Sequence, residues 1–232
     1  MESHLTHDEA LPKWTPSRWQ RPFVRASLLL SMLSLLVFLG LTTIVLRQMP
    51  PLYVDASVAL FLKQHTTHKG EHAMELVSAL ANPGVPLLGV AVALALAFKQ
   101  RWVDLGLWLT GLGGGLLINM TVKDFFDSRR PPWADPLHLG HFWQFPSGHV
   151  LGATIGYGLL ALLLWRKVDL LLFRVTLLLG LIALLLVIGF SRLYVRDHYL
   201  GDVLAGYAAG LSWLALCAGV WAAYRPARGV LQ

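Results

Sequence analysis

Cysteine and charge are what this 232-residue sequence has least of. Its one cysteine, Cys217, lies in an apolar stretch, which excludes an intrachain disulfide and favours a packing role for the thiol. Charged residues make up 14% of the chain and hydrophobic residues 56%, whereas soluble domains average about 25% charged residues. These proportions exclude an ordinary soluble domain and predict a chain embedded in lipid.

The charge that is present is mostly positive, with a net value of +6. Such an excess fits a nucleic acid, an anionic membrane surface or an anionic substrate. The cations lie between apolar stretches and form no continuous basic stripe, so we expect no nucleic acid partner. The cytoplasmic loops of membrane proteins also collect Lys and Arg, which accounts for part of the excess. Membrane lipids and an anionic substrate remain the expected partners.

Six apolar stretches approach or exceed the length of about 20 residues that crosses a bilayer. They are Phe23–Leu46, Met74–Phe98, Trp102–Val122, Val150–Trp165, Leu170–Phe190 and Leu200–Ala223. The sequence therefore predicts an all-α integral membrane bundle of six transmembrane helices, residues 23–224, between polar tails at 1–22 and 225–232. Because the first stretch follows some twenty polar residues, we expect a retained helix rather than a cleaved signal peptide.

The distribution of Lys and Arg predicts the orientation of the bundle. With a cytoplasmic N-terminus, eleven of the 19 cations face the cytoplasm and eight face outward, as the positive-inside rule expects. Both termini would then be cytoplasmic. The loops after the third and fifth helices would face the periplasmic side of a bacterial inner membrane.

Two irregular segments qualify this picture. Pro83 and Pro86 interrupt the second apolar stretch, and the segment 50–73 is expected to be an outside loop with some helical character. Four side chains at helical spacing near this loop resemble a metal site: His65, His68, His72 and Glu75. Because no Cys or Asp joins them, we favour a flexible loop and expect no metal. The glycines at 111, 113, 114 and 115 in the third stretch favour close helix packing.

Polar side chains gather in three clusters at the ends of the predicted helices. The clusters are Lys123–Pro131, Pro146–His149 and Ser191–Asp202. Two membrane crossings separate the loop after the third helix from the loop after the fifth, so both loops lie on the same side. The three clusters are therefore expected to form one pocket.

The first and third clusters bring together three cations, Lys123, Arg130 and Arg192. Cations gathered at a membrane are costly unless an anion neutralises them. The planar guanidinium matches the oxygens of a phosphate group. In the second cluster, Ser147 and Gly148 open the fourth helix, whose free amide groups and dipole favour an anion. The sequence thus predicts a phosphate site.

Histidines in the second and third clusters supply the expected chemistry. His198 and Asp202 are four residues apart and share a helical face if the last helix begins near them. The carboxylate would orient the imidazole and leave its other nitrogen free to attack phosphorus. His149 would protonate the leaving oxygen and then activate water. Singly, each side chain is more readily explained by an anchoring or capping role; together they predict catalysis.

At these residues the chain resembles the type 2 phosphatidic acid phosphatase superfamily. Its signature, K-x6-R-P, P-S-G-H and S-R-x5-H-x3-D, is matched at every fixed position from Lys123 to Asp202. The resemblance implies a metal-independent, cofactor-free phosphatase with a phosphohistidine intermediate. It places the nucleophile at His198 and the acid at His149. It implies phosphate binding by Lys123, Arg130, Ser147, Gly148 and Arg192.

In size the chain resembles bacterial members of this superfamily that act on undecaprenyl pyrophosphate, phosphatidylglycerophosphate or phosphatidic acid. Lipid A phosphatases are related to these members. The choice of lipid is expected in the segments Asp55–Ala73 and Trp133–Phe145 and in the groove between the helices. In the segment Trp133–Phe145, four aromatic side chains either line the mouth of the site or form an aromatic belt at the membrane interface. They are Trp133, Phe142, Trp143 and Phe145. Two alternatives stay open: a lipid phosphotransferase using the same intermediate, and a non-catalytic lipid-phosphate binder.

Overall fold

The described residues of the chain are entirely helical apart from short connections. The computed structural model describes residues 20–47, 53–127 and 145–224. The helices are α1 (Gln20–Leu46), α2 (Tyr53–His65), α3 (His68–Ala79), α4 (Gly84–Phe98), α5 (Trp102–Asp127), α6 (Gly148–Trp165), α7 (Leu171–Tyr194) and α8 (Leu200–Tyr224). Six helical segments are long and apolar enough to span a membrane, with α3 and α4 counted as one. The predicted all-α membrane bundle is confirmed.

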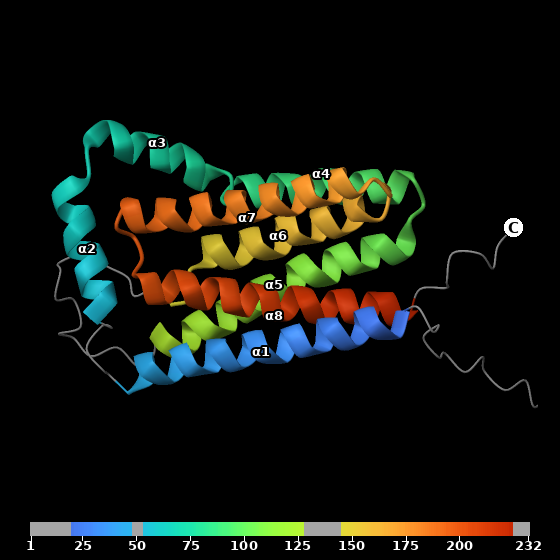
Figure 1. Ribbon diagram of the computed structural model, residues 1–232, viewed down its shortest axis with the longest axis horizontal. Coiled ribbons are helices and arrows are strands. Elements are labelled where there is room, and N and C mark those ends of the chain that lie inside the picture. The colour runs from blue at the N-terminus through green and yellow to red at the C-terminus, as the bar shows by residue number, and fades with distance from the viewer. Residues whose placement is uncertain (1–19, 48–52, 128–144, 225–232) are drawn as a thin grey trace, which may run out of the picture.

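Burial separates the central helices from those that face lipid. In the most apolar 18-residue window of α8, 61% of residues are buried, and 50% in that of α6, compared with 6% in α7. Large apolar side chains remain exposed along α1 and α7, as expected for a surface covered by hydrocarbon chains. Figure 1 shows α6 and α8 running through the bundle between the other long helices. The first turns of these two central helices carry His149 of the second cluster and Asp202 of the third.

Small residues allow the helices to approach closely where α8 meets α1. The hydroxyl of Ser212 on α8 donates a hydrogen bond of 3.0 Å to the carbonyl oxygen of Ser31 on α1. A Cβ atom added at Gly219 would lie 3.1 Å from the Cβ of Ser27. Small and hydroxyl-bearing residues are the usual means of helix association in a membrane, where the hydrophobic effect between helices is weak.

The glycines of α5 serve the same purpose, as the sequence predicted. A Cβ atom added at Gly111 would lie 2.5 Å from the side chain of Leu159, and one at Gly115 would lie 2.4 Å from Ile155. At Gly114 the added atom would lie 2.3 Å from the indole of Trp213. These three glycines let α5 fit against α6 and α8, whereas Gly113 has open space beside it.

Several predicted boundaries were wrong. The apolar stretch 74–98 is not one helix, because α3 ends at Ala79 and α4 begins at Gly84, after Pro83. The segment 50–73, predicted as an outside loop with some helical character, is more helical than expected, since α2 and the start of α3 occupy it. The third and fifth predicted helices run further than their apolar residues, to Asp127 and Tyr194. In both helices the first polar residues end the apolar run, but the helix continues beyond them.

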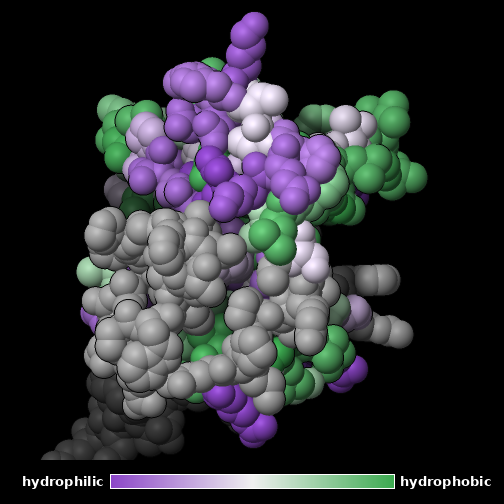
Figure 2. Space-filling model, turned by 90° about the vertical axis from the view of Figure 1, so that its left-hand side faces the viewer, coloured by the Kyte–Doolittle hydropathy of each residue, from purple (hydrophilic) through white to green (hydrophobic). Residues whose placement is uncertain are grey.

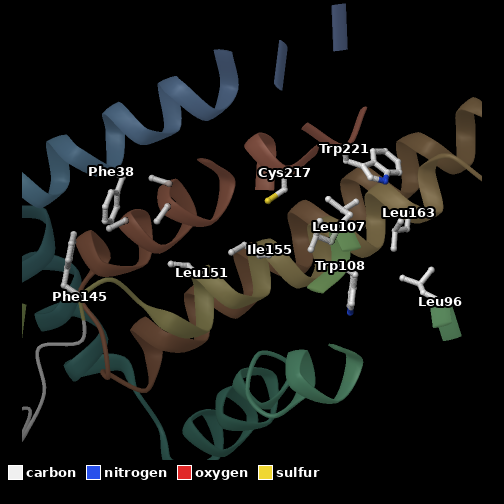
Figure 3. Close-up of a cluster of buried hydrophobic side chains, with 14 of the residues drawn as sticks. Phe38, Leu96, Leu107, Trp108, Phe145, Leu151, Ile155, Leu163, Cys217 and Trp221 are labelled. Carbon is white, nitrogen blue, oxygen red and sulfur yellow. The ribbon is translucent and has the colours of Figure 1, made fainter. Parts of the chain in front are cut away.

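Phe145 corrects the prediction for the segment Trp133–Phe145. Its side chain is 1% exposed, and its ring lies 4.8 Å from the ring of Phe126 and 6.0 Å from that of Phe38. Phe145 is thus part of the core rather than the mouth of the site or an interfacial belt. Figure 3 shows it at one end of the buried cluster, which continues past Ile155 and Cys217 to Trp221. The other three aromatic residues of that prediction lie outside the described residues.

The two short helices lie at one end of the bundle. Figure 1 shows α2 crossing the end where α6 and α8 begin, and α3 leading back along the bundle towards α4. Figure 2 views this end and shows hydrophilic side chains gathered over its upper part, where α3 lies. These helices thus cover the end of the bundle that holds the three clusters.

Candidate active site

The described members of the three clusters meet at this end of the bundle. His149, in the first turn of α6, interacts electrostatically with Lys123 from α5 and with Arg192 and His198 from the third cluster. The prediction that the clusters face the same side is therefore confirmed. Arg130, the remaining predicted phosphate ligand, lies outside the described residues.

The second and third clusters are joined through their backbones. The amide of Ser147 donates a hydrogen bond of 3.0 Å to the carbonyl oxygen of Asp202. Ser147 is fully buried, and its hydroxyl has no hydrogen-bond partner among the described residues. Helix α6 begins at the next residue, Gly148, with no side-chain cap. The free amide groups of this first turn and the unpaired hydroxyl together provide donors for an anion.

Gly206 allows α8 to pass directly behind this turn. A Cβ atom added at Gly206 would lie 2.8 Å from the carbonyl oxygen of Ser147 and 3.1 Å from the Cβ of Val150. Because the carbonyl oxygen of Ser147 is a backbone atom, it can make room for a side chain at Gly206 only if the whole turn moves. The position of the α6 N-terminus therefore depends on the absence of a side chain at Gly206.

We expect Gly206→Ala to lower the stability of the fold by about 1–3 kcal/mol, the usual cost of overpacking. Thermal unfolding of the purified protein in detergent measures this change. Gly152→Ala is the matched control, because a Cβ atom there meets nothing within 4 Å and alanine favours a helix. Equal melting temperatures for the two variants would contradict the close contact.

His198 and Asp202 form the expected pair, although His198 does not lie on a helix. It belongs to the turn between α7 and α8, two residues before α8 begins at Leu200. Its Nδ1 atom lies 3.5 Å from Oδ2 of Asp202, and its side chain is fully buried. This distance is longer than an ordinary hydrogen bond, as is common in catalytic pairs without substrate. Neither Nδ1 nor Nε2 of His198 has a hydrogen-bond partner among the described residues, and Nδ1 is the ring nitrogen that lies beside Asp202.

Asp202 also holds the start of α8. Its Oδ2 atom accepts a hydrogen bond of 3.0 Å from the amide of Tyr199, the residue just before the helix. This contact is half of a capping box, in which an acidic residue in the first turn reaches back to the amide of the capping residue. One carboxylate thus caps the helix terminus and lies beside the neighbouring imidazole.

Arg192 lies in the last turn of α7 rather than in the following loop, and it is 7% exposed. Its guanidinium donates to the hydroxyl of Ser78 on α3 and forms an ion pair with Asp197. Its Nε atom has no hydrogen-bond partner among the described residues. Ser78, which the sequence did not single out, therefore helps to direct this cation. No local pattern indicates the contact, because 114 residues separate the two.

Asn119 is a second residue that the sequence analysis missed. It lies one turn before Lys123 on α5, so the two share a helical face. A Cβ atom added at Gly148 would lie 3.1 Å from the amide of Asn119, whose Oδ1 atom is buried without a partner among the described residues. The i, i+4 spacing from Lys123 is the signal that points to it.

Asp55 on α2 is the third. Its side chain is buried, with 7% of the residue exposed, and its Oδ1 atom accepts a hydrogen bond of 2.9 Å from the amide of Gly201. Burial is the main cause that raises the pKa of the Asp55 carboxyl above its ordinary value of 3.8. The amide of Gly201 opposes this rise, and the carboxylate of Asp202 adds to it. The start of α8 therefore faces two carboxyl groups.

The raised pKa of Asp55 predicts how stability changes with pH. A carboxyl whose pKa rises on folding stabilises the fold in its neutral form, and this contribution is lost as the pH rises through the raised pKa. Asp55→Asn keeps a neutral acceptor at every pH. We therefore expect the melting temperature of Asp55→Asn, relative to the native protein, to increase as the pH rises above 3.8. The two melting temperatures are compared from about pH 3.5 to about pH 8, a range that includes the titration of a carboxyl with a raised pKa. A difference between them that does not change over this range would contradict the prediction.

The histidine-rich segment takes part in local contacts. Nδ1 of His65 lies 2.8 Å from the carbonyl oxygen of Phe61, and Nδ1 of His72 lies 3.3 Å from the carboxylate of Glu75. Within residues 20–47, 53–127 and 145–224, no group of three His, Cys, Asp or Glu side chains has the geometry to hold a metal ion. These histidines therefore have structural neighbours, and we assign them no ligand.

Two characterised proteins share part of this sequence. The chain is 32% identical over 130 residues to phosphatidylglycerophosphatase B of Bacillus subtilis strain 168, across 55% of this chain and 62% of that protein. It is 32% identical over 145 residues to the lipid A 1-phosphatase of Rhizobium johnstonii, across 57% of this chain and 53% of that protein. The matched region thus spans less than two thirds of either relative.

A solved structure and a family model also match this chain. A crystal structure of a transmembrane PAP2-type phosphatidylglycerolphosphate phosphatase from Bacillus subtilis superposes with a TM-score of 0.63 and 23% identity. The superposition covers 82% of this chain and 95% of that one, which shows a shared fold. The model of the PAP2 superfamily matches residues 87–225, more than half of the sequence. Because this match includes all three clusters, the chain belongs to the PAP2 superfamily, that of the type 2 phosphatidic acid phosphatases.

Proposed function

We propose that this protein is an integral membrane phosphatase that hydrolyses the terminal phosphate of a lipid phosphate or pyrophosphate. The observation that carries the proposal is the pairing of buried His198 with Asp202, within electrostatic range of His149 and its neighbouring cations. Pure binding of a phosphate needs only the cations. The two histidines and the orienting carboxylate are explained by catalysis.

In the first step, Nε2 of His198 attacks phosphorus. A nitrogen–phosphorus bond forms as the bond from phosphorus to the lipid oxygen breaks, and His149 gives its proton to that oxygen. Asp202 stabilises the positive charge that develops on the ring of His198. In the second step, His149 takes a proton from water, the water oxygen attacks phosphorus, and the nitrogen–phosphorus bond breaks. Inorganic phosphate leaves, and both histidines are restored.

The remaining residues bind the phosphate. Lys123, Arg130 and Arg192 neutralise its charge, and the amide groups and hydroxyl of Ser147 and Gly148 donate to its oxygens. These donors favour the transition state, in which negative charge builds up on the equatorial oxygens. The proposed chemistry proceeds through the imidazole of His198 and uses no metal ion.

The substrate is proposed to be undecaprenyl pyrophosphate, phosphatidylglycerophosphate or phosphatidic acid. The named activities of the two relatives, on phosphatidylglycerophosphate and on the 1-phosphate of lipid A, support a lipid carrying a terminal phosphate. The inward bias of Lys and Arg supports a bacterial inner membrane location with cytoplasmic termini and a periplasmic active site.

Phosphate release by the detergent-purified protein tests this proposal. The assay contains a chelator and compares the three lipids with a lipid A 1-phosphate. Release that survives chelation supports a metal-independent hydrolase, and the order of rates identifies the lipid. If folded protein releases no phosphate from any of the four, the hydrolase proposal fails. Transfer of the phosphoryl group to an added alcohol without phosphate release would indicate a phosphotransferase instead.

A further inference from the structure

Asp202 caps the amide of Tyr199 at the start of α8, and a second carboxylate reaches this terminus from outside the helix. The residue before its first turn is Tyr199, whereas the side chains that cap a helix well are short and carry an oxygen. Such a cap would accept a hydrogen bond from the amide of the second or third helical residue. In this chain Asp55 does so from α2, because its carboxylate accepts from the amide of Gly201. A distant helix thus supplies the acceptor for the Gly201 amide.

The other side of the His198 turn is held by α3. Oε1 of Glu71 lies 2.6 Å from the guanidinium of Arg196, and both side chains are about one third exposed. Arg196 has a φ of 61°, in the left-handed region that non-glycine residues rarely adopt. Its backbone conformation turns the chain between α7 and His198. Glu71 therefore anchors the residue at which the turn reverses direction.

These two contacts flank the nucleophile. Arg196 precedes His198 by two residues, and Gly201 follows it by three. Helix α3 is itself fixed to the end of α7, since the amide of Thr67 donates to the hydroxyl of Tyr194 at 3.3 Å. Both anchors belong to residues before the start of the family match at residue 87. They therefore lie outside the signature that defines the active site.

We propose that Asp55 and Glu71 are positioning residues, which hold the turn that carries His198 from both sides through the Gly201 amide and the Arg196 guanidinium. The proposal rests on the proposed function, because it assigns the two carboxylates a role in aligning the nucleophile. Its physical basis is that a turn lacks the repeating hydrogen bonds of a helix, so external contacts decide its position. A misplacement of about 1 Å can cost about a hundredfold in rate.

The first test removes the cap from α8. We expect Asp55→Ala to lower kcat by about 10- to 100-fold while KM changes less than about threefold, because the binding cations are untouched. The inhibition constant of inorganic phosphate should likewise change less than about threefold. Asp55→Asn keeps the acceptor for Gly201, so we expect it to retain kcat within about threefold of the native protein.

The second test concerns the ion pair between α3 and the turn. We expect Glu71→Ala to lower kcat by about threefold to tenfold, less than Asp55→Ala because this pair is partly exposed. Arg196→Ala keeps the Cβ atom and so adds no backbone strain at this position. The double variant should lose no more activity than either single variant, because both remove the same contact. Glu75→Ala is the matched control on the same helix, since Glu75 pairs with His72 and not with the turn.

All variants are assayed at least about 15 °C below their own melting temperatures, so that loss of folding does not contribute. The proposal is overturned if Asp55→Asn loses as much kcat as Asp55→Ala, or if both keep native kcat. For Glu71 the proposal is also overturned if the loss of kcat in the double variant equals the product of the losses in Glu71→Ala and Arg196→Ala. Activity retained by His198→Ala would instead refute the proposed function, so the two failures are distinguishable.

Discussion

Replacing His198 by alanine is expected to lower phosphate release from a lipid phosphate by at least about a thousandfold. The imidazole is proposed to form the bond to phosphorus, and no neighbouring side chain can replace it at that position. Binding should survive, because the cations and the α6 N-terminus remain. The measurements are the turnover rate of the detergent-purified variant and the dissociation constant of inorganic phosphate from a binding assay.

His72→Ala is the matched control for this experiment. His72 is exposed on α3 and pairs with Glu75, so its loss should leave turnover near that of the native protein. A His198→Ala variant that is folded and retains more than about a tenth of the native rate would exclude the histidine nucleophile.

Replacing His149 by alanine is expected to have an effect that depends on the leaving group. With a lipid phosphate, whose leaving oxygen is strongly basic, we expect a loss of about 100- to 10,000-fold, because no acid protonates that oxygen. With p-nitrophenyl phosphate the leaving group needs no proton. The first step should then survive, while the second step, which needs His149 as a base, should become slow.

Rapid mixing of this variant with p-nitrophenyl phosphate measures the difference. We expect a burst of about one nitrophenol per protein, followed by slow turnover as the phosphoenzyme accumulates. An equal loss of activity with both substrates and no burst would contradict the assignment of His149 as acid and base. It would favour a role for His149 in phosphate binding alone.

The sequence predicted the bundle and the gathering of the clusters for clear physical reasons. A membrane requires about 20 apolar residues per crossing, so the six spans are visible in composition alone. Alternation of crossings places the loops after α5 and α7 on the same side, whichever way the chain is inserted. This alternation predicts that Lys123, His149 and His198 meet, and His149 does lie within electrostatic range of the other two.

What the sequence did not reveal are contacts between residues far apart in the chain. Asp55 lies 146 residues before Gly201, and Ser78 lies 114 residues before Arg192. Neither belongs to a motif: Asp55 lies in the segment 50–73, predicted as an outside loop with some helical character, and Ser78 lies in the predicted membrane stretch Met74–Phe98. Composition indicated a helix from residue 74 onward, but it could not show that α2 and α3 lie over the end of the bundle that holds the site.

The error at α7 has a related cause. Its apolar residues end at Phe190, but the helix continues to Tyr194, where the polar residues Ser191 and Arg192 have hydrogen-bond partners within the protein. Ser191 donates to the carbonyl oxygen of Ile188, and Arg192 to Ser78. Arg192 therefore projects from a rigid helix, which is a better support for a phosphate ligand than the loop that was predicted.

The central claim, a phosphoryl group carried by His198, is tested most directly by trapping it. His149→Ala protein in the presence of chelator is mixed with p-nitrophenyl phosphate radiolabelled in its phosphoryl group, quenched in alkali and digested. The account predicts about one phosphoryl group per protein on the peptide that contains His198, stable in alkali and lost in acid. A protein that remains unlabelled, while turnover of the native enzyme requires an added divalent cation, would contradict it.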